Sequence, residues 1–225
     1  MTLYSDTEAA IEITIGTHPS RAVIWMHGLG ADGNDFVPIV EMLDLPTDVS
    51  LRFVFPHAPL RPVSINGGLR MRAWYDIKHT NPGKDEDENG LRASEGVIAT
   101  LIDQEKQRGI ASQKIVLAGF SQGGVMALQT GLRYPEKLAG MMVLSAYLPL
   151  ANTTLQEAHP TNRETPIFMA HGEHDSIVPI DLALASRQHL GAEHYAVEWH
   201  QYPMAHSLCD QELTDISRWL SKVLQ

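Results

Sequence analysis

The chain has a single cysteine, Cys209, among its 225 residues. One thiol cannot form an intramolecular disulfide or a CxxC pair, so a disulfide framework and a cysteine-based metal or redox motif are excluded. Basic side chains are also few: 17 Lys and Arg stand against 27 Asp and Glu, which gives a net charge of -10. That sign excludes bulk electrostatic attraction to nucleic acid or to an anionic membrane as the basis of function.

Long apolar runs are absent too, because none reaches the roughly 18 residues of a membrane span. The segment Met1–Glu12 lacks the basic and apolar regions of a signal peptide. We therefore expect a cytoplasmic protein. Hydrophobic side chains make up 44% of the chain and charged ones only 20%, a balance that favours a packed core and excludes whole-chain disorder. The length and the lack of repeats or linkers predict one domain over residues 1–225.

Short apolar segments alternate with amphipathic segments along the chain. The apolar segments are mostly rich in β-forming residues and bounded by Gly, Pro or polar residues, as buried strands are. They cover residues 21–27, 51–55, 114–119, 138–145, 166–171 and 195–202, and helical spacing occurs at 35–43, 91–108, 123–133, 180–190 and 210–224. This alternation predicts an α/β fold with a mostly parallel sheet, helices on both faces and no large lid domain.

Two further segments depart from this alternation. Residues 9–15 carry isoleucine at every second position, which predicts an antiparallel strand at the N-terminal edge of the sheet. Residues 56–89 have no sustained period, and a loop of this length is usually functional or mobile. It includes the acidic run Asp85–Glu88, which we interpret as a solvated loop tip.

The pentapeptide Gly119-Phe120-Ser121-Gln122-Gly123 fits the G-x-S-x-G nucleophile elbow, a sharp turn between a strand and a helix. It stands directly between the predicted strand 114–119 and the helical segment 123–133. A serine hydroxyl is a poor nucleophile without an adjacent base, so the turn must present Oγ to a histidine. The backbone N–H of Gln122, at the start of the helix, is placed to stabilise developing negative charge.

The base and its orienting acid are expected downstream, in the chain order Ser, Asp or Glu, His. Asp175 follows the strand 166–171, at the carboxyl end of a parallel strand, where active sites of open α/β sheets gather. His206 lies between the last predicted strand and the last helix. These positions predict a catalytic triad of Ser121, Asp175 and His206. Asp181 is the alternative acid, although a first helical turn is also where an acid complements the helix dipole.

A glycine-rich turn, Gly28–Gly33, follows the first predicted strand of the core. The backbone N–H of Leu29 in this turn is a candidate second oxyanion donor. The same residues satisfy G-x-G-x-x-G, which occurs in dinucleotide-binding folds. Such folds place an acid about 20 residues further on, at the end of the next strand. Here that strand runs into Pro56 and His57, which disfavours a dinucleotide site.

Six motifs together resemble the carboxylesterase and acyl-protein thioesterase group of α/β-hydrolases, also described as phospholipase/carboxylesterase proteins. The resemblance covers nearly the whole chain. The motifs are His27–Gly33, Phe55–Pro59, Arg72–Asp76, Gly119–Gly124, His171-Gly172 with Asp175, and Met204–His206. One departure is Ala205, where the family pattern would have glycine; its methyl group removes no catalytic atom.

The resemblance implies an α/β-hydrolase that cleaves carboxylic esters or thioesters of short to medium acyl chains through an acyl-enzyme on Ser121. It implies an oxyanion hole from the amides of Leu29 and Gln122, and neither a metal nor another cofactor. The substrate would be a small-molecule ester or an acylated protein, and a homodimer is a candidate assembly. Four residues become candidates for the acyl-pocket wall, each with ordinary packing as the alternative: Trp74, Ile65, Phe120 and Val178.

Two other functions stay open at this point. A lysophospholipase-type hydrolase would use the same triad on a lipid, and the sequence does not distinguish an alcohol, a protein thiol or a lysophospholipid as leaving group. A non-catalytic receptor would use the same fold to bind a small apolar ligand. The complete set of triad residues disfavours the receptor. Cys209 is disfavoured as a nucleophile because it follows no elbow.

Overall fold

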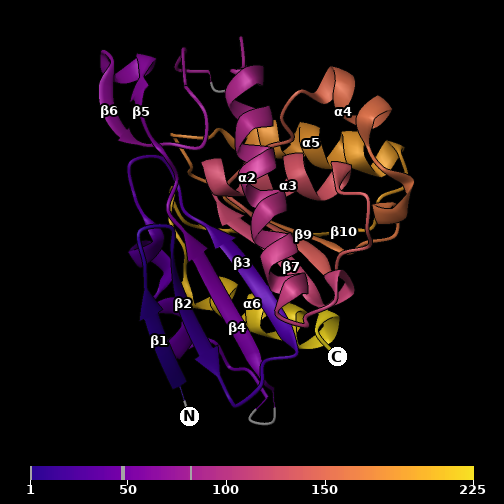
Figure 1. The fold of residues 1–225 in the computed structure, drawn as a ribbon. Coiled ribbons are helices and arrows are strands. Elements are labelled where there is room, and N and C mark those ends of the chain that lie inside the picture. Colours follow the sequence, from indigo (N-terminus) through magenta and orange to yellow (C-terminus); the bar gives the residue numbers. More distant parts are fainter. Residues whose placement is uncertain (1, 47–48, 82) are drawn as a thin grey trace.

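The computed structural model describes residues 2–46, 49–81 and 83–225, and a twisted eight-stranded sheet forms its centre (Figure 1). The order across the sheet is β1-β2-β4-β3-β7-β8-β9-β10, in which β1 and β2 pair antiparallel and all pairs from β4 to β10 are parallel. The predicted α/β-hydrolase fold is therefore confirmed. The strands are β1 (Thr2–Asp6), β2 (Ala10–Ile15), β3 (Arg21–Met26), β4 (Leu51–Pro56), β7 (Ile115–Phe120), β8 (Gly140–Leu144), β9 (Ile167–Gly172) and β10 (Val197–Tyr202).

Helices cover both faces of the sheet, as a parallel sheet requires. One face packs against α2 (Glu88–Gln107), α3 (Gln122–Arg133) and α5 (Ile180–Ala192), and α4 (Ala151–Glu157) packs on α3. The other face packs against the short α1 (Ile39–Met42) and against α6 (Asp210–Val223), which lies behind the sheet in Figure 1. The two apolar cores therefore hold the sheet rigidly between two helical layers.

The N-terminal edge of the sheet differs from the prediction. Strand β2 is antiparallel, as the isoleucine spacing indicated, but it lies between β1 and β4 and is not an edge. The edge is β1, whose side chains are all exposed. Thr2–Asp6 therefore carries no buried alternation, and only backbone pairing with β2 defines the strand.

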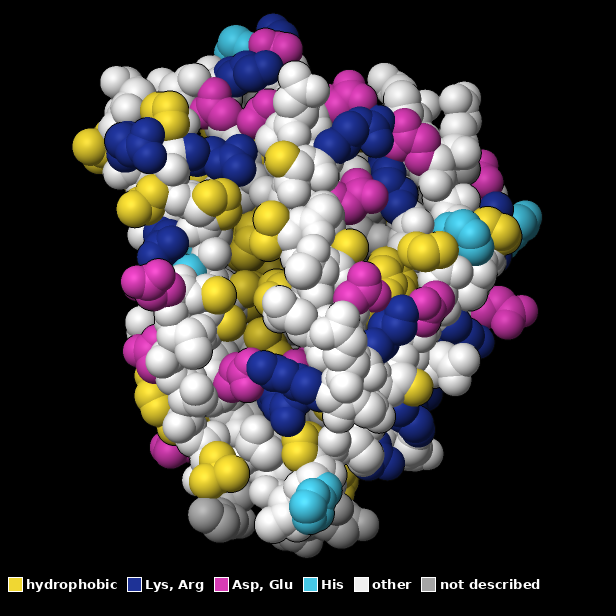
Figure 2. All heavy atoms as spheres, in the orientation of Figure 1, with side chains coloured by type: hydrophobic (Ala, Val, Ile, Leu, Met, Phe, Trp, Pro, Cys, Tyr) yellow, Lys and Arg dark blue, Asp and Glu magenta, His cyan; other side chains and the backbone are white. Residues whose placement is uncertain are grey.

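The long segment between β4 and α2 contains an antiparallel hairpin of β5 (Leu60–Val63) and β6 (Leu69–Arg72), with the short 3-10 helix η2 (Ser64–Asn66) at its turn. The hairpin stands at the upper left in Figure 1, and Figure 2 shows hydrophobic and basic side chains together in that region. Two of the exposed hydrophobic side chains there are Leu60 and Leu69.

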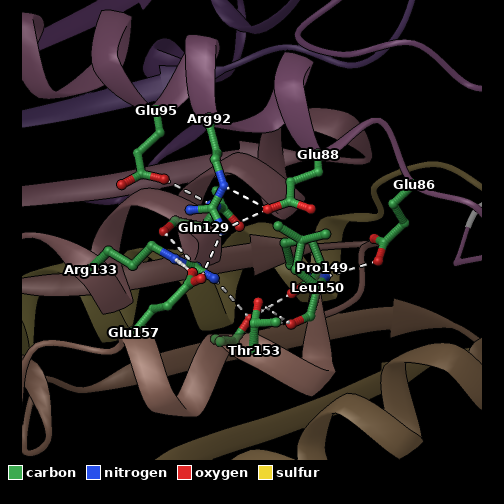
Figure 3. Close-up of polar contacts among 11 residues, drawn as sticks. Glu86, Glu88, Arg92, Glu95, Gln129, Arg133, Pro149, Leu150, Thr153 and Glu157 are labelled. Atoms are coloured by element: carbon green, nitrogen blue, oxygen red, sulfur yellow. Dashed lines mark hydrogen bonds and ion pairs between the residues drawn. The ribbon is translucent and has the colours of Figure 1, made fainter.

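The interpretation of the acidic run as a solvated loop tip was wrong for two of its carboxylates. Asp87 caps α2 by accepting a hydrogen bond from the Gly90 amide at 3.1 Å, and it also accepts one from the Asp76 amide at 2.9 Å. Glu86 accepts a hydrogen bond from the Leu150 amide at 2.9 Å (Figure 3). Backbone N–H groups that lack other partners recruit these carboxylates, so the loop is fastened to the body of the protein.

Candidate active site

The segments that follow four parallel strands carry the predicted functional residues. Parallel strands point the same way, so their carboxyl ends meet at one edge of the sheet. Leu29 follows β3, Ser121 follows β7, Asp175 follows β9 and His206 follows β10. The topology therefore gathers residues far apart in the sequence at one edge.

Ser121 occupies a strained turn between β7 and α3. Its φ of 55° and ψ of -120° lie where non-glycine residues are rare, and such backbone strain costs about 1–3 kcal/mol. The motif glycines permit the turn. A Cβ on Gly119 would come 2.1 Å from the carbonyl carbon of Gly123, and a Cβ on Gly123 would come 2.1 Å from the carbonyl oxygen of Met26. Only glycine at both positions lets strand and helix approach this closely.

Asp175 and His206 are brought together by the loops after β9 and β10. His206 Nδ1 donates a hydrogen bond to Asp175 Oδ2 at 2.6 Å. The other carboxylate oxygen, Oδ1, accepts from the amides of Ile177 at 2.9 Å and Val178 at 2.8 Å, and the Asp175 side chain is fully buried. A proton on Nδ1 leaves Nε2 of His206 as the acceptor that a general base needs.

The loop that carries His206 is tied to its neighbours. The Phe120 ring packs against the imidazole with 4.6 Å between ring centroids. The His174 amide donates to the Met204 carbonyl at 3.0 Å, which links the two loops. Ala205, the departure from the family pattern, is exposed, so its methyl group displaces nothing.

A second imidazole, that of His171, lies beside Asp175. Its Nε2 donates to the Val178 carbonyl at 2.8 Å and lies 3.4 Å from Asp175 Oδ2. Burial lowers the pKa of His171, so the ring is neutral near pH 7. The ring therefore shapes the loop locally. The alternative acid Asp181 is exposed in the first turn of α5 and has no hydrogen bond to His206 among the described residues.

The turn around Leu29 is fixed from both sides. His27 Nδ1 donates to the Gly28 carbonyl at 2.7 Å, while its Nε2 accepts from the Ala58 amide at 3.0 Å. Burial lowers the pKa of His27 to about 4, which keeps this neutral tautomer in place. On the other side, the Gly30 amide donates to the Arg72 carbonyl at 2.9 Å.

Gln122 is held by its side chain, which leaves its amide at the start of α3. Its Oε1 accepts from the Trp74 amide at 3.0 Å and its Nε2 donates to the Tyr75 carbonyl at 2.9 Å. Within the described part of the chain, neither the Gln122 amide nor the Leu29 amide donates a hydrogen bond. Both predicted oxyanion donors are therefore available to a ligand.

A cavity of about 260 Å³ contains Ser121, Leu29 and Gln122 in its lining. Ile65 and Val178, two of the four predicted wall residues, line it as well. Phe120 and Trp74 are not among its lining residues. Phe120 packs between Phe36 and His206. Trp74 is fully buried and its Nε1 donates to the His27 carbonyl at 2.9 Å, which favours the packing alternative for this residue.

The sequence did not indicate most of the cavity wall. The remaining lining residues are mostly apolar or aromatic and come from η2, from the segment that follows β6, from α3, and from the loops after β8 and β9. One of them, Tyr147, follows the carboxyl end of a predicted parallel strand, a position that could have singled it out. The full set that sequence reasoning missed is Asn66, Tyr75, Ile77, His79, Thr80, Val125, Tyr147 and Ile177.

Among residues 2–46, 49–81 and 83–225, no cluster of three or more His, Cys, Asp or Glu side chains is arranged to hold a metal ion. Over the same residues, no helix combines the length and apolar character needed to cross a membrane.

An elbow serine, an aspartate-oriented histidine and two unpaired amides on a mostly parallel sheet define the class of α/β-hydrolases. Comparison with known proteins supports this class. The model of the Phospholipase/Carboxylesterase family matches residues 8–224. The chain is similar to acyl-protein thioesterase 1 of Yarrowia lipolytica, with 36% identity over 218 residues that cover 95% of this chain and 96% of that protein.

Two further proteins extend the likeness. Acyl-protein thioesterase 1 of Gibberella zeae is 40% identical over 214 residues, which cover 91% of each chain. The crystal structure of Zea mays acyl-protein thioesterase 2 has a TM-score of 0.80 at 26% identity and covers 100% of this chain and 99% of its own. The chain belongs to the phospholipase/carboxylesterase family, and it is a hydrolase of carboxylic ester or thioester bonds.

Proposed function

We propose that the protein hydrolyses thioesters and esters of short to medium acyl chains through an acyl-enzyme on Ser121, with acylated proteins as the substrate class. The observation that carries this proposal is the hydrogen bond from His206 to the buried Asp175, made at the sheet edge where the Ser121 cavity opens. The names of the fungal and maize relatives, all acyl-protein thioesterases, support the thioester. A cytoplasmic location fits, since the one cysteine requires no oxidising compartment.

In the proposed reaction, Ser121 Oγ attacks the carbonyl carbon of the substrate while His206 Nε2 takes the hydroxyl proton. The carbonyl oxygen becomes an oxyanion, which accepts hydrogen bonds from the amides of Leu29 and Gln122. Collapse of this intermediate breaks the bond to the leaving sulfur or oxygen, which receives the proton from His206. A water molecule then gives its proton to His206 and attacks the acyl-enzyme, and the products are a carboxylic acid and regenerated Ser121.

The cavity wall favours an acyl chain over a charged group. Ile65, Ile77, Val125 and Val178 line it, so a chain gains about 0.8 kcal/mol for each methylene that leaves water. A neutral chain also meets no repulsion from a protein with a net charge of -10. The cavity volume of about 260 Å³ supports short to medium chains.

The test compares three octanoyl substrates: an S-acylated cysteine peptide, a simple alcohol ester and a lysophospholipid. We expect hydrolysis of the peptide thioester and the ester, and a loss of about 10³-fold or more in the Ser121→Ala variant. Ser207→Ala is the matched control, since Ser207 is an exposed serine next to His206 and should keep full activity. Full activity of Ser121→Ala would refute the acyl-enzyme, and a clear preference for the lysophospholipid would favour the lysophospholipase alternative.

A further inference from the structure

Tyr147 lies at the border of two cavities. It lines the cavity that contains Ser121, and it also lines a second cavity of about 560 Å³ between the 83–88 loop, α4 and α5. Among the described residues, it alone lines both cavities. The residue is only 3% exposed, so its ring is packed in the protein interior beside both cavities.

A chain of buried polar groups holds the Tyr147 ring in this position. Its hydroxyl is hydrogen-bonded both to the Glu86 carboxylate and to the Tyr75 hydroxyl. A carboxylate only accepts, so the Tyr147 hydroxyl is the donor in its hydrogen bond to Glu86. Tyr75 itself lines the Ser121 cavity.

Glu86 holds the Tyr147 loop at a second point. The carboxylate accepts a hydrogen bond from the Leu150 amide at 2.9 Å, three residues beyond Tyr147 (Figure 3). The Glu86 carboxyl is half-buried, and this burial raises its pKa. Withdrawal of a carboxylate from water is unfavourable unless donors compensate for it. The Tyr147 hydroxyl and the Leu150 amide, both from the loop after β8, donate to the carboxylate and compensate for this cost.

The second cavity can accept an extended chain on one side. Leu148, Leu150 and Leu182 give its wall an apolar part, and Asp85 and Glu88 give it an acidic part. A hydrocarbon chain that entered from the Ser121 cavity would meet the leucine side chains only if the Tyr147 ring were removed.

We propose that Tyr147 is the specificity-determining residue that ends the acyl pocket, and that Glu86 is its positioning residue. This inference rests on the proposed function, because it assigns the longest acyl chain that the same site accepts. The ring closes the pocket sterically, and Glu86 keeps the ring from turning aside. Loss of either group joins the two cavities and lengthens the pocket.

The test is a series of p-nitrophenyl esters from acetate to palmitate, with kcat/KM measured for the wild type and for Tyr147→Ala. In the wild type, kcat/KM should rise with chain length and then level off or fall. In Tyr147→Ala, kcat/KM should keep rising at longer chain lengths, by about fourfold for each additional methylene that is buried. The ratio of palmitate to butyrate should therefore increase by about tenfold or more relative to the wild type.

Glu86 is tested by two substitutions. Glu86→Ala should shift the chain-length limit in the same direction as Tyr147→Ala, by a smaller amount. Glu86→Gln should keep the wild-type chain-length limit, because the amide oxygen of glutamine still accepts a hydrogen bond from the Tyr147 hydroxyl. The matched control is Glu164→Ala, at an exposed glutamate that lines neither cavity, and it should leave the limit unchanged.

Each variant is also labelled with a fluorophosphonate, which separates the two proposals. A wild type that is not labelled at Ser121 contradicts the proposed function. A labelled Tyr147→Ala variant with the wild-type chain-length limit overturns the role of Tyr147 and leaves the proposed function intact. If Tyr147→Ala does not fold, then Tyr147→Leu and Glu86→Ala decide, and the proposal fails if both keep the wild-type limit.

Discussion

His206 donates a hydrogen bond to Asp175 at 2.6 Å across 31 positions of the sequence. The two residues follow neighbouring parallel strands, whose last residues, Gly172 of β9 and Tyr202 of β10, are register partners. The sheet therefore sets the distance between the two loops. Gly172 contributes directly, because a Cβ there would come 2.3 Å from the Ala205 carbonyl oxygen and push the His206 loop away.

The Asp175→Asn variant should keep its fold and lose most of its turnover. An amide does not stabilise the imidazolium and favours the wrong tautomer of His206, and the same change in a serine protease triad lowers kcat by about 10⁴. Steady-state kinetics on a simple ester, with circular dichroism for the fold, measure this. Asp181→Asn is the matched control and should have a mild effect, since Asp181 is exposed in α5. A large loss from Asp181→Asn with a small loss from Asp175→Asn would assign the acid to Asp181.

Trp74→Phe should lower activity equally for all acyl chains. The indole is fully buried and donates to the His27 carbonyl, so the substitution removes a buried hydrogen bond and costs about 1–3 kcal/mol of stability. Trp74 does not line the cavity, whereas Ile65 does. Ile65→Ala should therefore reduce kcat/KM more for octanoate than for acetate. If Trp74→Phe has the chain-length effect and Ile65→Ala does not, the assignment of these two residues is reversed.

The sequence predicts the buried strands well and the exposed ones poorly. Strands β3, β4 and β7 to β9 are almost entirely buried, so they read as mostly apolar segments, whereas β10 at the far edge of the sheet is only partly buried. Strand β1 is exposed, and the hairpin of β5 and β6 is largely exposed, so neither leaves such a pattern. Their pairing depends on backbone hydrogen bonds, which a list of side chains does not show.

The residues of the candidate site also differ in how well the sequence predicts them. Ser121, Asp175 and His206 follow strand ends, so the elbow motif and the order of the elements single them out as candidates. The cavity wall could not, because adjacent residues of one irregular segment have different environments. Trp74 is buried away from the cavity while Tyr75 lines it, and hydrogen bonds between the Gln122 side chain and both backbones help to fix that arrangement.

Gly123→Ala should abolish activity and destabilise the protein strongly. The added methyl would come 2.1 Å from the Met26 carbonyl oxygen, so α3 would have to move away from β3 and take Ser121 with it. Gly96→Ala is the matched control inside α2, where an added Cβ meets no atom within 4 Å. That variant should be stabilised by about 0.5–1 kcal/mol. Thermal unfolding of both variants tests this, and a stable, active Gly123→Ala would contradict the close approach.

The contribution of Glu212 to the free energy of unfolding should decrease as the pH rises from about 5 to about 8. This residue is fully buried in α6, and burial raises its pKa from 4.5 to about 8. The unfolded chain releases the proton near 4.5, so between these values the folded state binds more protons and the free energy of unfolding decreases. Above about 8 both states are ionised and the decrease ends.

The Glu212→Gln variant isolates this contribution, because it keeps the shape and removes the titration. Its melting temperature relative to the wild type should increase between pH 5 and pH 8. Glu41→Gln, at an exposed position, should show no such trend. A constant difference between Glu212→Gln and the wild type over this range would contradict a protonated Glu212 in the folded protein.

The most direct test of Ser121 as the nucleophile is to identify the residue that reacts covalently. The protein is incubated with a fluorophosphonate, digested, and the modified residue is identified by mass spectrometry. One adduct is expected, on Ser121, formed in the wild type and in Asp181→Asn, and formed much more slowly in Asp175→Asn. Modification at another residue, or none with Ser121 intact in a folded protein, would contradict Ser121 as the nucleophile.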